Sequence, residues 1–277
     1  MKKPDRRALT AIAVCLALSA CSTLSVQQEK KLGYEVQRQV REEFQFLRDP
    51  VIVNYVRGIG DQIVRASPPS PFDFRFYVIE DEMINAFAIP GGAVYINTGL
   101  ITSASNVAEL AGVLAHEIAH VTARHVAQNY KRQRNTGLAA QLVSVLIAIV
   151  SGNSYIAQGG QTATSIAAQA YMNTYTQDAE SEADALAVDS MVAAGFDPQA
   201  LVTMFQTLQA EAQGGYAMPQ FLQSHPATSE RIQSVSALIR ARGSPQGLRL
   251  EDRKLPIIKE RIRLIVGTDM EREPESL

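Results

Sequence analysis

Residues 116–120 read His-Glu-Ile-Ala-His, and this segment constrains the chain more than any other. Two histidines four residues apart lie on one face of a helix, where both can bind the same zinc ion. Glu117 would then stand beside the metal and could accept a proton from a metal-bound water. The surroundings favour a helix, because Asn106 and Glu109 fit a capping box and the apolar residues that follow have helical spacing. A helix with two structural histidines is the alternative.

A zinc ion held by two histidines needs a third protein ligand if one position is left for water. Residues 180–184, Glu-Ser-Glu-Ala-Asp, lie in a second helical stretch at about 176–194. Glu180 and Asp184 share a face of this helix, whereas Glu182 points nearly the opposite way. We therefore expect Glu180 to bind the metal and Asp184 to orient a ligand histidine from behind. An acidic helix start could also do no more than complement the helix dipole.

Further segments accompany these two motifs. Residues 85–92 (Asn-Ala-Phe-Ala-Ile-Pro-Gly-Gly) and 95–100 (Tyr-Ile-Asn-Thr-Gly-Leu) precede the histidine helix, and residues 224–226 (Ser-His-Pro) with Arg231 follow the glutamate helix. In all of them the chain resembles the gluzincin zinc metallopeptidases related to HtpX and the CAAX prenyl proteases. Within that family it is most similar to the periplasmic BepA/LoiP-like lipoprotein branch. The resemblance covers roughly residues 50–235.

The resemblance implies a mostly helical α+β fold, with a small sheet beside the histidine helix, and one Zn²⁺ per chain held by His116, His120 and Glu180. It also implies a zinc metalloendopeptidase that hydrolyses misfolded or stalled envelope and outer-membrane proteins. His225 resembles a histidine that takes the fourth zinc position in self-inhibited relatives; it could instead stabilise the transition state or be a surface residue. Arg231 could hydrogen-bond a substrate carbonyl or the developing oxyanion as a catalytic residue, or be solvated at a helix start.

Two short strands are expected at residues 72–79 and 93–97, the second after a Pro-Gly-Gly turn. Metallopeptidases of this kind hold an extended peptide by adding it to a sheet edge. We expect residues 93–97 to form that edge and residues 85–88 to line the cleft, with an ordinary core hairpin as the alternative. The residues predicted to contact substrate are Asn85, Ala86, Phe87, Ala93 and Tyr95.

Helical spacing predicts further elements at about residues 25–47, 49–66, 106–134, 162–171, 198–212 and 228–240. His125 follows His120 by five residues in one of these helices, so it should point away from the ligand face and be structural. Residues 138–150 are apolar but too few to span a membrane, and either pack in the core or form an interfacial element. Residues 151–164, rich in glycine and polar residues, are expected to be a loop, and the two segments together could form a lid.

The N-terminus has the pattern of a lipoprotein signal peptide. Basic residues at 2–7 precede a short apolar stretch at 9–18, and small residues lead to Cys21. Cleavage before Cys21 would leave a lipidated cysteine that anchors the protein stably in a membrane. Ser22 resembles the default signal for the outer membrane, so we expect a lipid-anchored envelope protein that faces the periplasm. An ordinary secretory peptide with a chance cysteine is the alternative.

Charge and cysteine content limit the function further. The formal net charge of −2 becomes about −5 when residues 1–20 are removed, and no basic stripe is present, which argues against nucleic acid as a partner. Cys15 and Cys21 are the only cysteines, so the mature chain can form no internal disulfide. The expected partners are the membrane, through Cys21, and unfolded or misassembled envelope proteins; the oligomeric state stays open.

The expected organisation is a signal peptide, an N-terminal helical segment, a metallopeptidase domain and a C-terminal tail, at residues 1–20, 21–48, 49–243 and 244–277. Two rival functions remain open. One is a latent peptidase that acts mainly as a chaperone-like assembly factor for outer-membrane proteins. The other is a structural lipoprotein in which the histidine motif is incidental.

Overall fold

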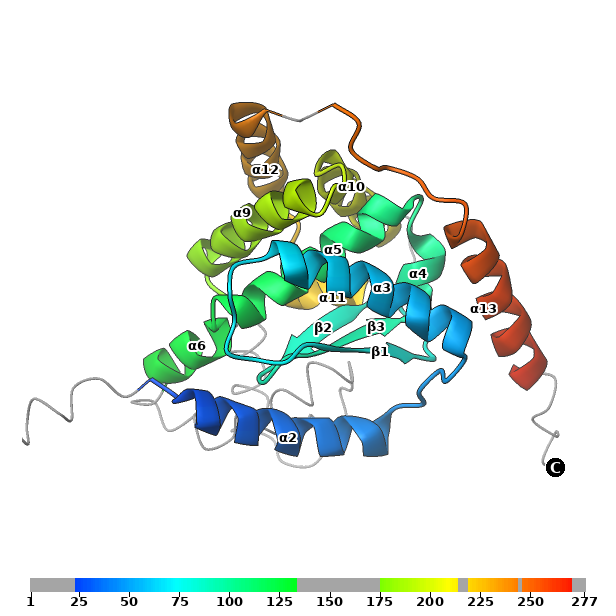
Figure 1. The fold of residues 1–277 in the computed structure, drawn as a ribbon, viewed down its shortest axis with the longest axis horizontal. Helices are drawn as coiled ribbons and strands as arrows, with labels where there is room; N and C mark the ends of the chain where they lie inside the picture. Colours follow the sequence, from blue (N-terminus) through cyan, green and yellow to red (C-terminus); the bar gives the residue numbers. More distant parts are fainter. Residues whose placement is uncertain (1–22, 134–174, 214–218, 244–245, 271–277) are drawn as a thin grey trace, which may run out of the picture.

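The computed structural model describes residues 23–133, 175–213, 219–243 and 246–270. Its central element is α5 (Val107–Thr122), which packs against a small sheet and against the helices α3 (Pro50–Ala66), α9 (Gln177–Ala193) and α10 (Gln199–Gln213) (Figure 1). The remaining described helices are α2 (Val26–Glu43), α4 (Thr98–Ser103), α6 (His125–Gln133), α11 (Gln220–Ser224), α12 (Ser229–Arg242) and α13 (Leu255–Met270). The predicted fold class, a mostly helical α+β core with a small sheet beside the histidine helix, is confirmed.

Asn106 caps α5 as expected, but the expected capping box forms only in part, because Glu109 bonds to Ser105 N rather than to Asn106 N. The side chain of Asn106 accepts a hydrogen bond from the backbone N–H of Glu109 at 2.9 Å, and the Glu109 carboxylate accepts one from Ser105 N at 2.6 Å. Every residue from Val107 to Val121 is buried, so this helix has no solvent-facing side. Any polar side chain on α5 therefore has to find its partner inside the protein.

The predicted continuous helix at 106–134 is wrong, because the chain breaks after Thr122 and restarts as α6 at His125. Arg124 adopts a left-handed backbone conformation with φ of 59°, which is strained for a residue other than glycine. Its guanidinium donates to buried Glu29 of α2 at 2.6 Å and to the carbonyl oxygen of Leu24 at 2.6 Å. These tertiary contacts stabilise the break. They cannot be predicted from hydrophobic periodicity, which is a local property of the chain.

The sheet has the strand order β1-β3-β2, with β1 (Arg75–Ile79) parallel and β2 (Ala86–Ile89) antiparallel to β3 (Ala93–Asn97). The prediction that residues 93–97 form the free edge is wrong, because β3 is the middle strand and pairs on both sides. Ala93 and Tyr95 are buried there and cannot offer their backbone to an added peptide. β2, which we expected only to line the cleft, is an edge strand.

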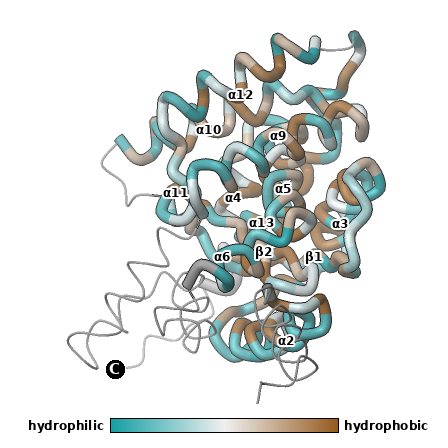
Figure 2. The backbone as a smooth tube through the Cα atoms, turned by 90° about the vertical axis from the view of Figure 1, so that its left-hand side faces the viewer, coloured by the Kyte–Doolittle hydropathy of each residue, from teal (hydrophilic) through white to brown (hydrophobic). Residues whose placement is uncertain are grey.

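The sheet lies between two apolar layers. Alternate β3 side chains, Val94 and Ile96, belong to the main core with α3 and α5, while Tyr95 faces Val36 and Val40 of α2 on the other side. Figure 2 shows α2 nearly end-on beneath β1 and β2. α2 therefore covers the face of the sheet that α5 leaves open.

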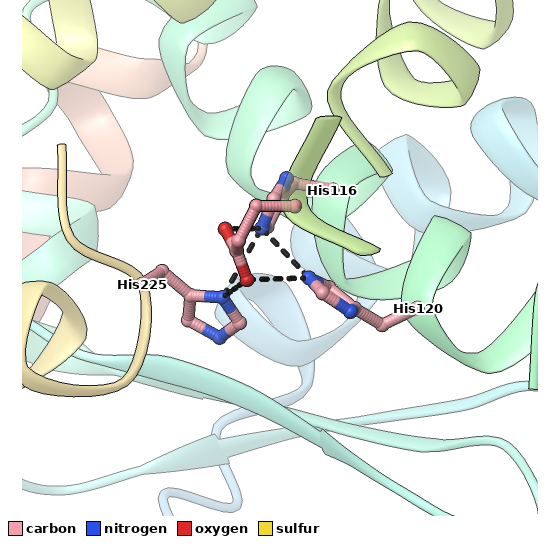
Figure 3. Close-up of side chains that lie close together, drawn as sticks. His116, His120 and His225 are labelled. Carbon is pink, nitrogen blue, oxygen red and sulfur yellow. Dashed lines mark hydrogen bonds and ion pairs between the residues drawn. The ribbon is translucent and has the colours of Figure 1, made fainter. Parts of the chain in front are cut away.

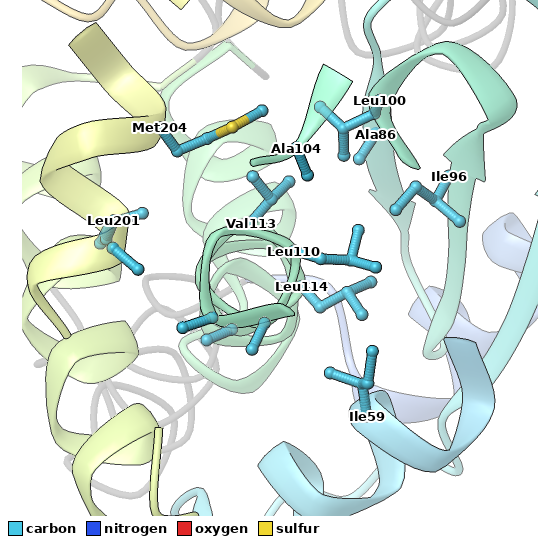
Figure 4. Close-up of a cluster of buried hydrophobic side chains, with 14 of the residues drawn as sticks. Ile59, Ala86, Ile96, Leu100, Ala104, Leu110, Val113, Leu114, Leu201 and Met204 are labelled. Atoms are coloured by element: carbon cyan, nitrogen blue, oxygen red, sulfur yellow. The ribbon is translucent and has the colours of Figure 1, made fainter. Parts of the chain in front are cut away.

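The main core fixes α5 in place. Leu110 and Leu114 point toward the sheet and Ile59 of α3, whereas Val113 points toward Met204 of α10 (Figure 4). Burial of each such side chain contributes about 1.5–3 kcal/mol. α13, which lies in the predicted C-terminal tail, adds Leu255, Ile258 and Ile262 to this core, and therefore packs as part of the folded unit.

Several expectations concern residues that the structure does not describe. They are the signal peptide and Cys21, the apolar stretch at 138–150, the loop at 151–164 and the helix at 162–171. Among the described helices, none has both the length and the apolar character needed to cross a membrane.

The close approach of α2 to the turn between β2 and β3 predicts the effect of a substitution. A Cβ at Gly33 would lie 1.7 Å from the carbonyl oxygen of Pro90, whereas a Cβ at Gly58 in α3 would meet nothing within 4 Å. We expect Gly33→Ala to destabilise the protein by about 1–3 kcal/mol. Gly58→Ala is the control and should stabilise it by about 0.5–1 kcal/mol. Urea unfolding measures both, and equal effects would contradict this packing.

Candidate metal centre

Four buried side chains from three parts of the chain converge on the side of the sheet where α5 packs (Figure 3). His116 and His120 come from α5, Glu180 from α9, and His225 from the residue that caps α11. One ligand atom from each lies within 4.8 Å of the others, and Figure 3 shows the three imidazoles turned toward a common point. The structure thus brings together the three predicted ligands and the predicted regulatory histidine.

The spacing of these atoms suits a four-coordinate metal ion. The two Nε2 atoms of His116 and His120 are 2.9 Å apart, and each is 3.4 Å from a carboxylate oxygen of Glu180. His225 Nδ1 lies 3.2 Å from His116 Nε2 and 2.9 Å from Glu180 Oε1. In a tetrahedral zinc site with bonds of about 2.0–2.1 Å, neighbouring ligand atoms are about 3.3 Å apart. The donor types and their spacing therefore fit such an ion.

Asp184 lies one turn after Glu180 on α9 and supports His116 from behind. Its Oδ1 is 3.0 Å from His116 Nδ1, so the other ring nitrogen is directed at the metal position. Burial alone would raise the pKa of Asp184, but hydrogen bonds from the Arg231 guanidinium lower it below its ordinary value. Asp184 is therefore an ionised acceptor that orients His116, which is the arrangement expected from the sequence.

Arg231 occupies a different position from the one expected. It is buried on α12 and donates to both oxygens of Asp184 at 2.6 and 2.8 Å, and its Nη1 lies 2.6 Å from Glu180 Oε2. Its guanidinium also stacks 4.5 Å from the centroid of Phe205. The alternative of a solvated arginine is wrong, because Arg231 is buried. The interpretation of Arg231 as a catalytic residue is also revised, because its N–H groups bond to the carboxylates behind the metal position rather than to a substrate.

Glu117 is buried beside the ligands and is held by the sheet. The backbone N–H of Ala88 on β2 donates to its carboxylate, and His225 Nε2 is 3.4 Å from its Oε1. Burial raises the pKa of Glu117 to about 7, although His225 acts in the opposite direction. A carboxyl group that titrates near neutrality is suited to accept and return a proton.

His225 is buried, so the alternative of a surface histidine is wrong. α11 packs against the segment before β2, where Phe221 N donates to Ile84 O at 3.3 Å and Asn85 Nδ2 donates to Gln220 Oε1 at 2.9 Å. Phe221 also stacks on the His225 ring, with centroids 4.9 Å apart. Asn85, expected to contact substrate, is itself buried and holds the helix that presents His225.

The predicted substrate-contacting side chains on β2 do not line an open cleft. Ala86 is buried in the main core, and Phe87 stacks on Tyr95 toward α2 with centroids 4.7 Å apart. Ala88 is only partly buried, and its N–H points to Glu117. The backbone of β2, rather than its side chains, is what this strand presents to the site.

His125 departs most from the sequence prediction. The prediction that it points away from the ligands is wrong, because the break at Arg124 turns its ring back toward α5. Its Nδ1 lies 2.8 Å from His120 Nδ1, and its Nε2 lies 3.3 Å from Glu182 Oε2. Glu182 is exposed, as expected for the face opposite Glu180, yet its carboxylate contacts His125, which in turn contacts the predicted ligand His120.

Tyr175 is a neighbour of the site that sequence reasoning missed. Its ring centroid is 4.0 Å from that of His120, and it stacks on His225 at 5.4 Å. Tyr175 immediately precedes the cap of α9, and no spacing or motif distinguishes it from the other tyrosines of the chain. Only the packing of α9 against α5 brings it to the metal centre.

Comparison with known proteins gives matches that include this centre. The model of peptidase family M48 matches residues 54–239. The beta-barrel assembly-enhancing protease of Escherichia coli (strain K12) is 34% identical over 220 residues, which are 78% of this chain and 45% of that protein. The putative beta-barrel assembly-enhancing protease of Vibrio cholerae is 36% identical over 217 residues, 77% of this chain and 44% of that protein.

A mitochondrial relative matches as well. The metalloendopeptidase OMA1 of Schizosaccharomyces pombe is 28% identical over 216 residues, covering 76% of this chain and 61% of that protein. The chain spans about 45% of the length of the two bacterial relatives. The similarity therefore concerns the part of those proteins that corresponds to the fold described above.

The raised pKa of Glu117 predicts how pH affects the metal-free protein. Its pKa rises from 4.5 to about 7 on folding, so the folded chain favours the protonated form, and the carboxyl costs stability as pH rises through this interval. Glu117→Gln removes that titration. The variant should therefore gain stability relative to the wild type between about pH 4 and about pH 8, by up to about 3 kcal/mol. Denaturant unfolding without metal measures the gain, and a difference that does not vary with pH would contradict it.

Proposed function

Because the chain belongs to peptidase family M48, we propose that it is a zinc metalloendopeptidase of the bacterial cell envelope. Its substrates would be misfolded or misassembled envelope proteins, including those of the outer membrane. One observation carries the proposal: a buried set of two histidines and a glutamate has a second glutamate, Glu117, next to it and an edge strand alongside. Each of these parts has a separate task in peptide hydrolysis.

His116, His120 and Glu180 would hold the metal, and Asp184 and Arg231 would keep two of these ligands in position. A bound zinc ion would supply a Lewis acid for the scissile carbonyl and lower the pKa of a water molecule. Glu117 accepts the proton of the attacking water and returns it to the leaving nitrogen. Ala88 is only partly buried and hydrogen-bonds to Glu117, so a peptide bound along β2 would lie close to this base.

The substrate would bind as an extended strand along β2. An added strand is recognised mainly through backbone hydrogen bonds, so binding tolerates many sequences. β3 cannot serve because it is paired on both sides, and the outer side of β1 is partly covered, since Leu47 N donates to Val78 O at 3.0 Å. Recognition through the backbone suits chains that have lost their fold, which is the substrate class that the proposal names.

His225 would hold the resting enzyme in a slow state. Its Nδ1 occupies the fourth position of the ligand set, 2.9 Å from Glu180 and 3.2 Å from His116. A fourth protein ligand excludes the water that hydrolysis needs. The same observation favours the second candidate function, a latent peptidase that acts mainly as a chaperone-like assembly factor. Displacement of His225 by a substrate or a partner would then turn on proteolysis.

The cellular location is proposed from the sequence. Lipidation at Cys21 would anchor the protein to the outer membrane, facing the periplasm. The bacterial relatives are named for enhancing beta-barrel assembly, which supports an envelope location for this chain. The negative charge of the mature sequence argues against nucleic acid as a partner.

The proposed base predicts a clear separation of binding from catalysis. Glu117→Gln should bind zinc like the wild type but cleave unfolded casein about 10²–10⁴-fold more slowly, because it removes the proton acceptor and no ligand. Glu180→Ala should lose both zinc and activity, since it removes a ligand. Zinc content and casein digestion are the measurements, with exposed Glu43→Gln on α2 as the control. Wild-type cleavage by Glu117→Gln would refute the mechanism.

Replacement of His225 predicts which role this histidine has. If it occupies the fourth position in the resting enzyme, His225→Ala should raise the basal rate of casein cleavage several-fold and leave zinc content near the wild-type value, because three ligands remain. A fall in the rate at unchanged zinc content would instead assign His225 to the transition state. The initial rate of digestion before any activator is added distinguishes the two.

A further inference from the structure

His120 has a partner that neither its motif nor its helix predicts. Its Nε2 faces the ligand set, 2.9 Å from His116 Nε2 and 3.4 Å from Glu180 Oε1. Its other nitrogen, Nδ1, lies 2.8 Å from Nδ1 of His125, which is buried at the start of α6. His116 instead meets the carboxylate of Asp184 directly. The two histidines of one motif are therefore oriented by chemically different groups.

The protons along this contact can be assigned from hydrogen-bonding capacity. Two imidazole nitrogens 2.8 Å apart need one donor and one acceptor between them. An ionised carboxylate can only accept hydrogen bonds. Glu182 lies 3.3 Å from His125 Nε2, so this nitrogen must carry the proton that it donates. Neutral His125 then has a lone pair on Nδ1 and accepts the Nδ1–H of His120. His120 Nε2 is left unprotonated, with its lone pair free for a metal.

We propose that His125 is a positioning residue for the metal centre, which accepts the Nδ1–H of His120 and so fixes the tautomer and ring plane of that ligand. Glu182 completes the chain of contacts by accepting from His125. This inference rests on the proposed role of His120 as a metal ligand. It goes beyond the proposed function because it assigns His125 and Glu182 to the centre.

The backbone supports this role. A continuous helix would carry His125 away from the ligand face, since five residues correspond to well over one helical turn. The chain instead breaks at Arg124, and buried Glu29 of α2 binds the Arg124 side chain and stabilises the break. The geometry that aims His125 at His120 is thus maintained by a strained residue with its own ion pair.

The test compares two replacements of His125 with a control on the same helix. His125→Phe keeps a ring but removes the acceptor, whereas His125→Asn keeps an acceptor close to the position of Nδ1. Val126→Ala, which removes apolar packing from α6, is the control. Zinc affinity is measured by competition with a chromophoric chelator, and the stability of each metal-free protein by thermal unfolding. The absorption spectrum of the cobalt-loaded protein reports ligand geometry.

Loss of the partner of a ligand histidine typically lowers metal affinity about 10–100-fold. We expect that loss of zinc affinity, together with an altered cobalt spectrum, in His125→Phe. His125→Asn should recover part of the affinity. The metal-free melting temperature of His125→Phe should be no lower than that of Val126→Ala. Wild-type zinc affinity in His125→Phe would overturn the inference, and so would equal loss in the Phe and Asn variants. Failure of the wild type itself to bind zinc would instead refute the proposed function.

Glu182 provides a second test, through a residue at the protein surface. Glu182 is exposed, so Glu182→Ala should leave folding intact and weaken zinc binding less than His125→Phe does. If Glu182 acts only through His125, it should have no further effect once His125 is Phe. Equal effects of Glu182→Ala in both backgrounds would overturn the proposed chain of contacts.

Discussion

The metal centre depends on one arrangement of buried charge. Arg231 lies between Glu180 and Asp184, with a guanidinium nitrogen 2.6 Å from a carboxylate oxygen of each. Two desolvated carboxylates one turn apart would otherwise repel each other and favour protonation, and a protonated Glu180 would be a poor ligand. Because the arginine comes from α12 and both carboxylates from α9, the centre is complete only when the C-terminal helices are folded against the ligand helices.

The need of buried polar groups for a partner also applies all along α5. This helix is buried on every side, so each of its polar side chains needs an internal partner. Each partner comes from a different element: Thr203 of α10 for Glu109, Asp184 of α9 for His116, the Ala88 backbone of β2 for Glu117, and His125 of α6 for His120. The apolar core and the metal centre are therefore one structure, since the helices that exclude water from α5 are also those that orient its functional groups.

Much of the fold and of the site could be predicted from local patterns. The start of α5 follows from its Asn106 cap, and the pairing of Glu180 with Asp184 follows from helical spacing. Three positions could not be predicted, each for a physical reason. β2 has only four residues, too few to show alternation; Arg231 looks like an ordinary first-turn arginine; and the break at Arg124 is stabilised by Glu29, which lies 95 residues earlier in the chain.

The sequence by itself determined which residues share a helix face, because the period of a helix is a local property of the chain. That was enough to predict the histidine pair, the glutamate on a second helix and the acceptor behind it. The tertiary structure decided what lies opposite each face: β2 rather than β3 as an edge, carboxylates rather than substrate for Arg231, and His120 rather than a structural position away from the ligands for His125. Such contacts depend on how elements far apart in the chain pack together. The periodicity of a single sequence reports local structure and does not predict that packing.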